Sequence, residues 1–146
     1  MTVYYGWYIE QMDVVTAFLY KKIDGVIYVK MPHKFSIPSI VYRLNKALYG
    51  LKQSPRIWQE TLNTTFKALS FRRLYNDYAL YINNSTDTFV GIYVDDLLIF
   101  GADLAFIKEL KASLAQQYRI TDLGSYKDYL GTEIHRDIIK QTLTIN

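Results

Sequence analysis

The pattern of apolar and polar positions predicts both strands and helices, and one strand pair is interrupted by charge. Residues 88–94 and 97–100 are rich in β-branched and aromatic side chains, which predicts two neighbouring strands. Two adjacent acids, Asp95 and Asp96, stand between them in an otherwise almost unbroken apolar run. Because burying a charge without a partner is costly, these acids indicate a tight hairpin turn, a bound divalent cation, or both.

Helical spacing of apolar residues appears in two other segments. Ser54-Pro55 predicts the start of a helix, since serine is a favourable N-cap and proline is tolerated at the first helical position. Asp103 is the expected N-cap of a second helix. The apolar face of the first helix consists of Trp58, Leu62, Phe66 and Leu69. The apolar face of the second consists of Leu104, Ile107, Leu110 and Leu114.

The order of the predicted elements indicates an α+β fold. The chain reads as β, β, α, three strands, α and β, which is typical of an antiparallel sheet with helices packed on one face. Repeats, low-complexity tracts and Gly/Ser linkers are not found, so a single domain over residues 1–146 is expected. The other predicted strands are residues 8–15, 26–30, 41–44, 78–82, 126–134 and 141–145.

A second carboxylate is needed if the acid pair binds a metal. Neighbouring side chains on a strand point to opposite faces, so only one of Asp95 and Asp96 can point directly at a shared ion. Asp13, near the end of the predicted strand 8–15, is the best candidate for the second ligand. If that strand neighbours the 88–100 hairpin, Asp13 and Asp95 converge at one edge and suit Mg²⁺, which prefers oxygen ligands. The alternative is that Asp13 ends its strand facing solvent.

Composition and charge narrow the classes of function. The 146 residues are 50% hydrophobic and include no cysteine, which excludes a disulfide framework and a Cys-based zinc site. Residues 1–73 carry 11 Lys/Arg and 4 Asp/Glu, a net charge of +7. Residues 74–146 carry 6 Lys/Arg and 10 Asp/Glu, a net charge of −4. This asymmetry favours a protein that binds a polyanion and a cation on different surfaces. The alternative is a chance scatter of solvated charges.

The N-terminal and apolar segments lack targeting signals. No apolar run reaches the length of a membrane span, and the first residues lack the layout of a signal peptide. We therefore expect a soluble intracellular protein with no membrane partner.

Four blocks of sequence, in order, resemble one family. They are QMDVVTAFLY, VYRLNKALYGLKQSPRIW, IYVDDLLIFG and ITDLGSYKDYLGTEIHRD. Together they resemble the reverse transcriptase of copia-type retrotransposons, an RNA-dependent DNA polymerase within a Pol polyprotein, from about Ile9 to Asp137. The resemblance implies a polymerase palm-like sheet. It also implies that the fingers region before the first palm motif, the connection region and the ribonuclease H domain are absent.

The resemblance assigns catalytic roles to the acids. Asp13, Asp95 and Asp96 match the catalytic positions, with Asp13 and Asp95 as ligands of two Mg²⁺ ions, or Mn²⁺, and Asp96 in support. Phe18 matches the aromatic position beneath the sugar of the incoming nucleotide, where a ring would clash with a 2′-hydroxyl and favour deoxynucleotides. From the local sequence alone, plain core packing is the preferred interpretation of Phe18.

A second group of matched residues is implied to bind the template. Gln53 is the expected direct contact with the nascent base pair. Lys52 and Arg56 are expected to bind phosphates, helped by the positive end of the helix that begins at Ser54. An ordinary capped helix with two solvated bases fits the same residues.

The last block is implied to grip the 3′ end of the primer. Leu130, Gly131 and Thr132 match this hairpin, for which a routine edge hairpin is the alternative. The triplet Asp122-Leu123-Gly124 is a signature of the family, with an expected structural role.

The implied function is template-directed DNA synthesis by two-metal nucleotidyl transfer. Its partners would be an RNA or DNA template with a primer, deoxynucleoside triphosphates, and other segments of a Pol polyprotein. The expected location is the cytoplasm, in a virus-like particle for an intact element, or the nucleus. The alternative is a catalytically inactive retroelement remnant that binds nucleic acid weakly at most.

Overall fold

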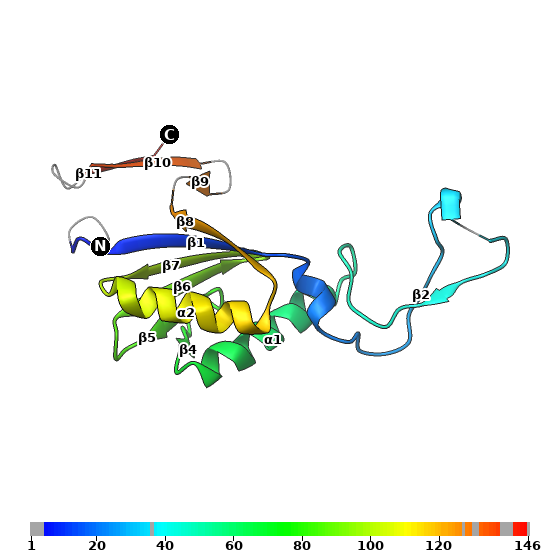
Figure 1. Ribbon diagram of the computed structural model, residues 1–146. Helices are drawn as coiled ribbons and strands as arrows, with labels where there is room; N and C mark the ends of the chain where they lie inside the picture. Colours follow the sequence, from blue (N-terminus) through cyan, green and yellow to red (C-terminus); the bar gives the residue numbers. More distant parts are fainter. Residues whose placement is uncertain (1–4, 36, 127, 130–131, 138–141, 146) are drawn as a thin grey trace. The chain divides into compact units, whose positions relative to one another are not determined.

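The computed structural model describes residues 5–35, 37–126, 128–129, 132–137 and 142–145 (Figure 1). The chain divides into two compact units, which are described separately below. Unit 1 contains residues 1–15 and 64–146, and unit 2 contains residues 16–63. This division into compact units does not test the prediction of a single domain over residues 1–146, which stays a prediction. Within the described ranges, no helix is both long and apolar enough to cross a membrane.

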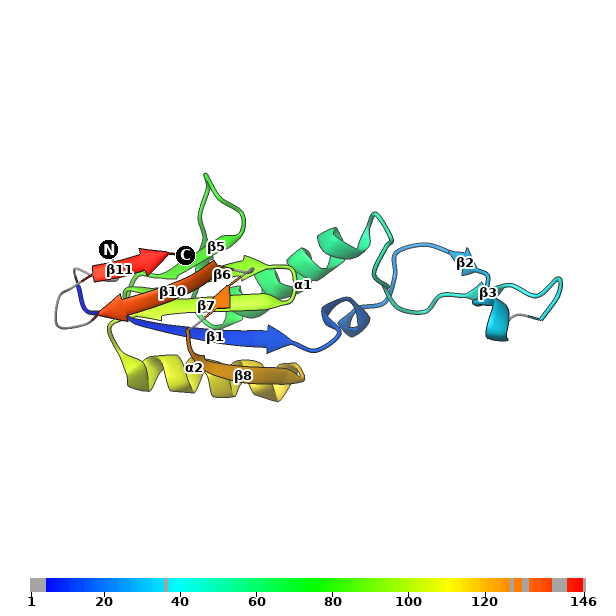
Figure 2. The same ribbon diagram turned by 90° about the horizontal axis from the view of Figure 1, so that it is seen from above.

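Unit 1 is built on a six-stranded antiparallel sheet with the strand order β4-β5-β6-β7-β1-β8. Figures 1 and 2 show β1 at the side of β7, with β6 beyond it. The sheet and two helices confirm the predicted α+β class. Its strands are β1 (Tyr8–Val14), β4 (Arg72–Arg73), β5 (Leu80–Asn83), β6 (Thr88–Tyr93), β7 (Asp96–Gly101) and β8 (Ile120–Ser125).

The core of unit 1 lies on one face of this sheet. Tyr81, Val90 and Ile99 are opposite one another on β5, β6 and β7, and each is 0% exposed. Phe66, near the end of α1 (Ser54–Ala68), packs on the same face, with its ring centroid 4.8 Å from that of Tyr81. Because residues two apart on a strand share a face, alternate positions of each strand point to the other side.

The helix α2 (Leu104–Gln117) covers the same face of the sheet. Asp103 is its N-cap, as predicted, since one carboxylate oxygen accepts hydrogen bonds from the backbone N–H of Ala105 at 2.8 Å and of Phe106 at 3.1 Å. At Gly101 of β7, an added Cβ would lie in ordinary contact with the helix, 3.5 Å from Cδ1 of Ile107, but only 3.0 Å from Oγ1 of Thr88 on β6. The close approach of the Thr88 side chain explains a glycine at the end of an otherwise apolar strand.

The start of α1 differs by one residue from the prediction. Ser54 was the expected N-cap, but it is already helical, and its buried hydroxyl donates to the carbonyl of Leu48 at 2.5 Å. The carbonyl of Gln53 accepts the first backbone bond of the helix, from Ile57 N–H at 3.0 Å. Gln53 is therefore the N-cap residue. The prediction was wrong because the serine hydroxyl bonds the preceding loop instead of the helix.

Unit 2 contains little regular structure besides the first part of α1. Its strands β2 (Tyr28–Val29) and β3 (Tyr42–Arg43) form a two-stranded antiparallel pair, shorter than the predicted strands 26–30 and 41–44. The 3-10 helices are η1 (Ala17–Tyr20) and η2 (His33–Phe35).

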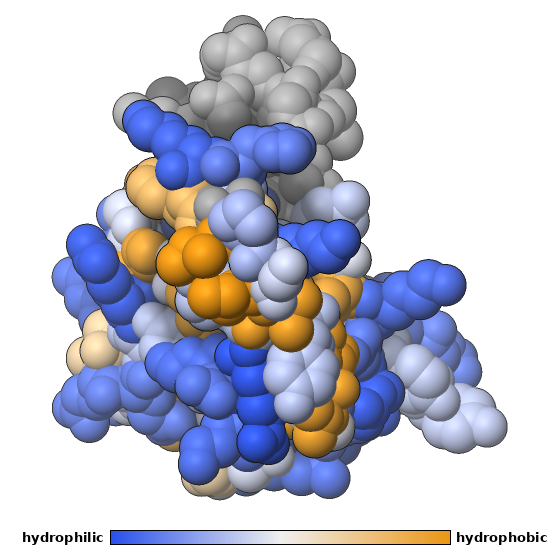
Figure 3. Space-filling model, turned by 90° about the vertical axis from the view of Figure 1, so that its right-hand side faces the viewer, coloured by the Kyte–Doolittle hydropathy of each residue, from blue (hydrophilic) through white to orange (hydrophobic). Residues whose placement is uncertain are grey.

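Many large apolar side chains of unit 2 are exposed. Examples are Val26 at 58%, Phe35 at 63% and Ile37 at 53% exposed. Figure 3 shows one face of the molecule, on which hydrophobic side chains reach the surface between hydrophilic ones. Of the exposed apolar side chains, Met31, Ile37, Ile40 and Val41 line one pocket. Contiguous exposed apolar surface is typical of surfaces that contact something else.

The C-terminal part of the chain differs most from the predicted strands. The sequence predicts a strand over residues 126–134, whereas β8 ends at Ser125 and is followed by β9 (Asp128–Tyr129) and β10 (Thr132–Asp137). The last predicted strand, 141–145, corresponds to β11 (Thr142–Ile145), with Gln141 outside the described residues. Strands β11, β10 and β9 form a three-stranded sheet in that order.

Candidate active site

The adjacent acids lie at a two-residue hairpin turn. Strands β6 and β7 pair up to Tyr93 opposite Asp96, which leaves Val94 and Asp95 as the turn. Two-residue hairpin turns require a positive φ, and Val94 has a φ of 55°. A β-branched residue rarely adopts this conformation. The hairpin predicted from the interrupted apolar run is confirmed, and it holds a strained residue next to the acids.

The neighbouring strand brings a third acid to this turn. Asp13 of β1 is directly opposite Asp96 of β7, and the backbone N–H of Val14 donates to the carbonyl of Asp95 at 2.8 Å. Directly opposite residues share one face of the sheet. Asp13, Asp95 and Asp96 therefore gather where β1 ends beside the β6–β7 turn, and we call them the acid cluster.

Asp13 and Asp96 of the acid cluster lie on the face of the sheet opposite the core. Asp13 and Asp96 are each one position away from core residues, Met12 and Leu97, which are 2% and 0% exposed. Because side chains alternate along a strand, the two carboxylates point away from the helices. The acid cluster is thus carried by a packed sheet without being enclosed in its core.

The electrostatics of Asp96 reflect its surroundings. Burial raises the pKa of Asp96 above its ordinary value, and the negative charges of Asp13 and Asp95 raise it further. A hydrogen bond from Gln11 to the carboxylate lowers the pKa in part. Like charges in one place favour a bound cation, which would offset their repulsion.

Gln11 was not predicted from the sequence as part of the site. It lies two residues before Asp13 on β1 and is 8% exposed. The period of two along a strand puts it on the face that carries Asp13. This spacing was the signal that could have identified it.

The donor set of the acid cluster suits Mg²⁺ in one of its usual binding modes. In the part of the chain that the structure describes, no group of three or more His, Cys, Asp or Glu side chains is arranged to hold a metal ion. Mg²⁺ is often bound by one or two carboxylates, several waters and substrate phosphates instead of by a protein-only cage. Carboxylates opposed across two strands fit that mode.

The strand register bears on which acid is the second ligand. From the sequence, Asp95 is expected to pair with Asp13, with Asp96 in support. The register sets Asp96 opposite Asp13 and leaves Asp95 at the turn, with its Oδ1 atom buried. The assignment of Asp95 as the metal ligand stays a prediction.

Phe18 has the surroundings of a packed residue. It is part of η1, is 6% exposed, and its ring centroid lies 4.4 Å from that of Tyr49. This contact within unit 2 agrees with core packing. Its role beneath a nucleotide sugar stays a prediction.

The predicted template-binding residues lie around the start of α1 in unit 2. Lys52 is exposed and Gln53 is half-buried. Arg56 forms ion pairs with Asp24 at 2.9 Å and Glu60 at 2.8 Å. Hydrogen bonds to these two carboxylates raise its pKa above the ordinary value. A phosphate at Arg56 would therefore compete with two carboxylates that the guanidinium already contacts.

The predicted primer-binding residues are described only in part. Leu130 and Gly131 lie outside the described residues. Thr132 begins β10 and is opposite Tyr129 of β9. Their role with the primer stays a prediction.

Charge is divided between the two units. Unit 2 carries eight Lys/Arg against two Asp/Glu, a net charge of +6, and unit 1 carries nine against twelve, a net charge of −3. The acid cluster belongs to the acidic unit, and Lys52 and Arg56 belong to the basic unit. The charge asymmetry of the sequence therefore follows the division into two units.

Comparisons with known proteins identify the family. A sequence profile described as reverse transcriptase (RNA-dependent DNA polymerase) matches residues 1–146. The chain belongs to the reverse transcriptase family. This confirms the resemblance to copia-type retrotransposon reverse transcriptases that the four sequence blocks indicate.

Proteins of plant and yeast transposons are among those similar to this chain. The chain is 35% identical to the retrovirus-related Pol polyprotein from transposon TNT 1-94 of Nicotiana tabacum, over 94% of the chain. It is 38% identical to the putative transposon Ty5-1 protein of Saccharomyces cerevisiae, over 86% of the chain. The matched part is 11% of the tobacco polyprotein and 42% of the yeast protein. This reverse transcriptase domain thus spans less than half the length of these relatives.

Proposed function

We propose that this chain is the metal-binding catalytic part of a copia-type reverse transcriptase that performs template-directed DNA synthesis. The observation that carries the proposal is the convergence of Asp13 with Asp95 and Asp96 at the end of β1. Membership of the reverse transcriptase family supports it. The antiparallel sheet with helices on its other face is the arrangement expected of a polymerase palm.

The acids would hold the ions needed for nucleotidyl transfer. In the proposed reaction, the 3′-hydroxyl of a primer attacks the α-phosphate of a deoxynucleoside triphosphate, and pyrophosphate leaves. Bound Mg²⁺ or Mn²⁺ would lower the pKa of the hydroxyl and neutralise charge on the phosphates. Asp13 and Asp95 are the proposed ligands, and Asp96 is the supporting acid. Gln11 would orient Asp96 through the hydrogen bond between their side chains.

Unit 2 would bind the nucleic acid and the nucleotide. Its net charge of +6 supports contact with a phosphate backbone, and Lys52 and Arg56 are the proposed phosphate ligands. Gln53 is proposed to contact the nascent base pair and Phe18 the nucleotide sugar. The segment with Leu130, Gly131 and Thr132 is proposed to contact the primer end.

Other segments of a Pol polyprotein are proposed to complete the enzyme. The region that matches this chain makes up only 11% and 9% of two plant Pol polyproteins, so these relatives are several times longer than the matched region. The exposed apolar side chains of unit 2, such as Val26 and Phe35, are suited to be covered by such segments.

A second candidate is a catalytically inactive retroelement remnant that binds nucleic acid weakly. The ion pairs of Arg56 with Asp24 and Glu60, which a phosphate would have to displace, favour it. In that case the acid cluster would be retained as structure without turnover.

Mg²⁺ binding separates a retained metal site from a lost one. A titration with Mg²⁺, followed by thermal unfolding, should stabilise the wild-type chain by about 2.7 kcal/mol at one hundred times the dissociation constant. Asp13→Asn should abolish this stabilisation. Glu109→Gln, an exposed change on α2, is the matched control and should keep it. Equal stabilisation of Asp13→Asn and the wild type would refute the metal site.

Primer extension separates the two functions. The reaction contains the chain, an RNA template with a DNA primer, deoxynucleotides and Mg²⁺. Extension that Asp95→Asn abolishes and Glu109→Gln leaves unchanged would support the polymerase. Absence of extension by the wild-type chain would favour the remnant for the isolated protein.

A further inference from the structure

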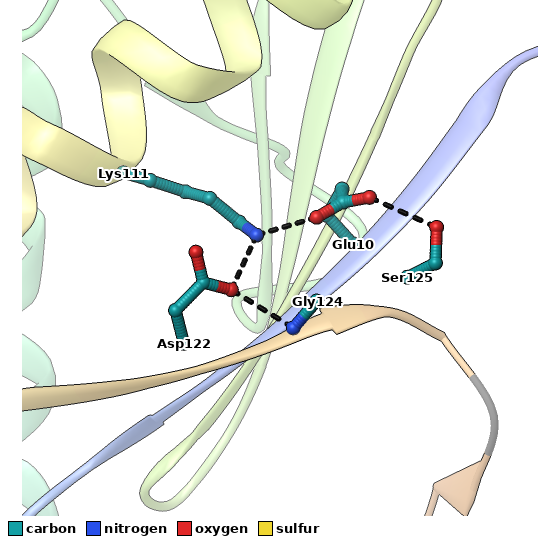
Figure 4. A network of polar contacts seen from close by, with 5 residues as sticks. All are labelled: Glu10, Lys111, Asp122, Gly124 and Ser125. Carbon is teal, nitrogen blue, oxygen red and sulfur yellow. Dashed lines mark hydrogen bonds and ion pairs between the residues drawn. The ribbon is translucent and has the colours of Figure 1, made fainter.

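Lys111 is a buried lysine that joins three elements of unit 1. Its side chain is 8% exposed, and its Nζ atom lies 2.5 Å from Oε2 of Glu10 and 2.6 Å from Oδ1 of Asp122. Figure 4 shows the lysine reaching from α2 to Glu10 on β1 and Asp122 on β8. A buried charge is costly unless it is paired, so Lys111 holds both strands close to the helix.

The same network fixes a bulge between β1 and β8. The register runs from Gln11 opposite Gly124 to Met12 opposite Asp122, so Leu123 is skipped and is 50% exposed. Gly124 has a φ of 74°, and its N–H donates to Oδ1 of Asp122 at 2.9 Å. Bulges bend strands and are common beside active sites, where they redirect a side chain.

Glu10 is also held from the other side of the bulge. The hydroxyl of Ser125 donates to Oε1 of Glu10 at 3.0 Å, while Oε2 receives Lys111 (Figure 4). Both carboxylate oxygens of Glu10 are therefore engaged. The triplet Asp122-Leu123-Gly124, predicted to be structural, supplies the acid, the skipped residue and the positive φ of this bulge.

The bulge lies immediately before Asp13. Past it, Asp13 is opposite Thr121 and Val14 is opposite Ile120, so the end of β1 depends on β8 for its outer support. Glu10 and Asp13 are three positions apart and thus point to opposite faces of the sheet. Lys111 consequently acts on Asp13 through the strand and without contact with the acid cluster.

The burial of the Lys111–Glu10 pair separates it from the ion pairs of unit 2, whereas the Asp122 side chain is 55% exposed. The side chains of Arg56, Asp24 and Glu60 are 56%, 65% and 61% exposed, and exposed pairs of this kind contribute little. The side chain of Glu10 is 13% exposed, so loss of Lys111 would leave a largely buried carboxylate without its cation.

We propose that Lys111 is a positioning residue for Asp13: by joining α2 to Glu10 and Asp122, it holds the β1–β8 bulge and sets where the end of β1 carries its carboxylate. The consequence for metal binding rests on the function proposed above. The structural consequence, a fixed end of β1, does not.

Amide hydrogen exchange without metal tests the structural consequence directly. The reporters are the amides of Val14, bonded to the carbonyl of Asp95 at 2.8 Å, and Val15, bonded to that of Arg119 at 2.9 Å. In Lys111→Met, exchange of both should be at least tenfold faster, with little change at Val90 in β6. Lys108→Met, an exposed change on the same helix, should behave as the wild type.

Mg²⁺ affinity is the second readout. Lys111→Met should weaken the apparent Mg²⁺ affinity at least threefold, and Lys108→Met should not change it. If the wild-type chain gains no stability from Mg²⁺, the proposed metal site fails, while the exchange rates still decide whether Lys111 fixes the end of β1.

Two results would overturn the proposal. One is unchanged exchange at Val14 and Val15 in Lys111→Met, and the other is acceleration by the same factor at Val90, which would make Lys111 a general stabiliser. If Lys111→Met does not fold, Asp122→Asn is measured in the same way. It leaves the pair of Lys111 with Glu10 in place and should accelerate the same two amides by a smaller factor.

Discussion

The strained turn next to the acids gives a prediction whose sign depends on one backbone angle. Val94 has a φ of 55°, between Tyr93 at the end of β6 and Asp95. At ordinary φ values, replacing alanine by glycine lowers the free energy of unfolding by roughly 0.5–1 kcal/mol, because glycine loses more conformational entropy on folding. At a left-handed position, alanine and other residues with a Cβ are disfavoured by roughly 1–2 kcal/mol. The preference for alanine should therefore reverse at Val94.

The magnitude follows from the difference between these two effects. Val94→Gly and Val94→Ala both remove the valine methyl groups, so the lost burial of a side chain that is 44% exposed largely cancels between them. The glycine variant should be more stable than the alanine variant by about 0.75 kcal/mol, the central value of a range of roughly 0–1.5 kcal/mol. For a chain of this length, the central value corresponds to a melting temperature about 2–3 °C higher.

The assay is thermal unfolding of both variants at one pH without divalent cations. The control is Ala112→Gly on the exposed side of α2, where glycine should cost about 1 kcal/mol relative to alanine. If Val94→Gly melts below Val94→Ala, as glycine does in the helix, Val94 does not have the left-handed conformation, and the account of the turn is wrong.

Three further predictions concern the cap, the core and the acid cluster. Asp103→Ala should destabilise the fold by about 1 kcal/mol in urea unfolding, and Asp103→Asn by much less, because asparagine still caps α2. Phe66→Ala should cost about 3–5 kcal/mol, since the ring is 0% exposed against Tyr81, and a loss below 1 kcal/mol would contradict the packing. Asp96→Asn should raise the melting temperature at pH 7 without metal. The pKa of Asp96 is higher in the folded state than in the unfolded state, so the folded state binds more protons. The wild-type chain therefore loses stability as the pH rises from the unfolded pKa of this carboxyl to its folded pKa. The gain of Asp96→Asn should vanish below that pH interval. A gain that persists there would refute its assigned cause, which is burial of the charged carboxylate together with repulsion from Asp13 and Asp95.

Features that depend on neighbours in the chain could be predicted from the sequence. The hairpin at Asp95 and Asp96 follows from charge interrupting an apolar run, and the cap at Asp103 follows from a short polar residue before a helical pattern. Both arise from interactions over a few residues. The pairing of β1 with β7 could be anticipated because a metal site at the acid pair needs a second carboxylate, and this pairing supplies Asp13.

Features that depend on distant partners could not be read in this way. Strand β8 (Ile120–Ser125) has no alternating apolar pattern, because it is an edge strand whose extended form comes from pairing with β1 across more than a hundred residues. Lys111 is surrounded in sequence by residues of an ordinary amphipathic helix, and only the fold brings Glu10 to it. Whether Asp95 or Asp96 is opposite Asp13 depends on the length of one turn, which the apolar pattern leaves open.

The acid cluster is proposed to bind a divalent cation, and Mn²⁺ can locate that ion directly. In an NMR titration of the ¹⁵N-labelled chain, substoichiometric Mn²⁺ should first broaden the amides of Asp13, Val14, Val94, Asp95 and Asp96. Excess Mg²⁺ should restore these signals by competition. Broadening that begins elsewhere, or that spreads evenly over the acidic residues of the surface, would contradict the account.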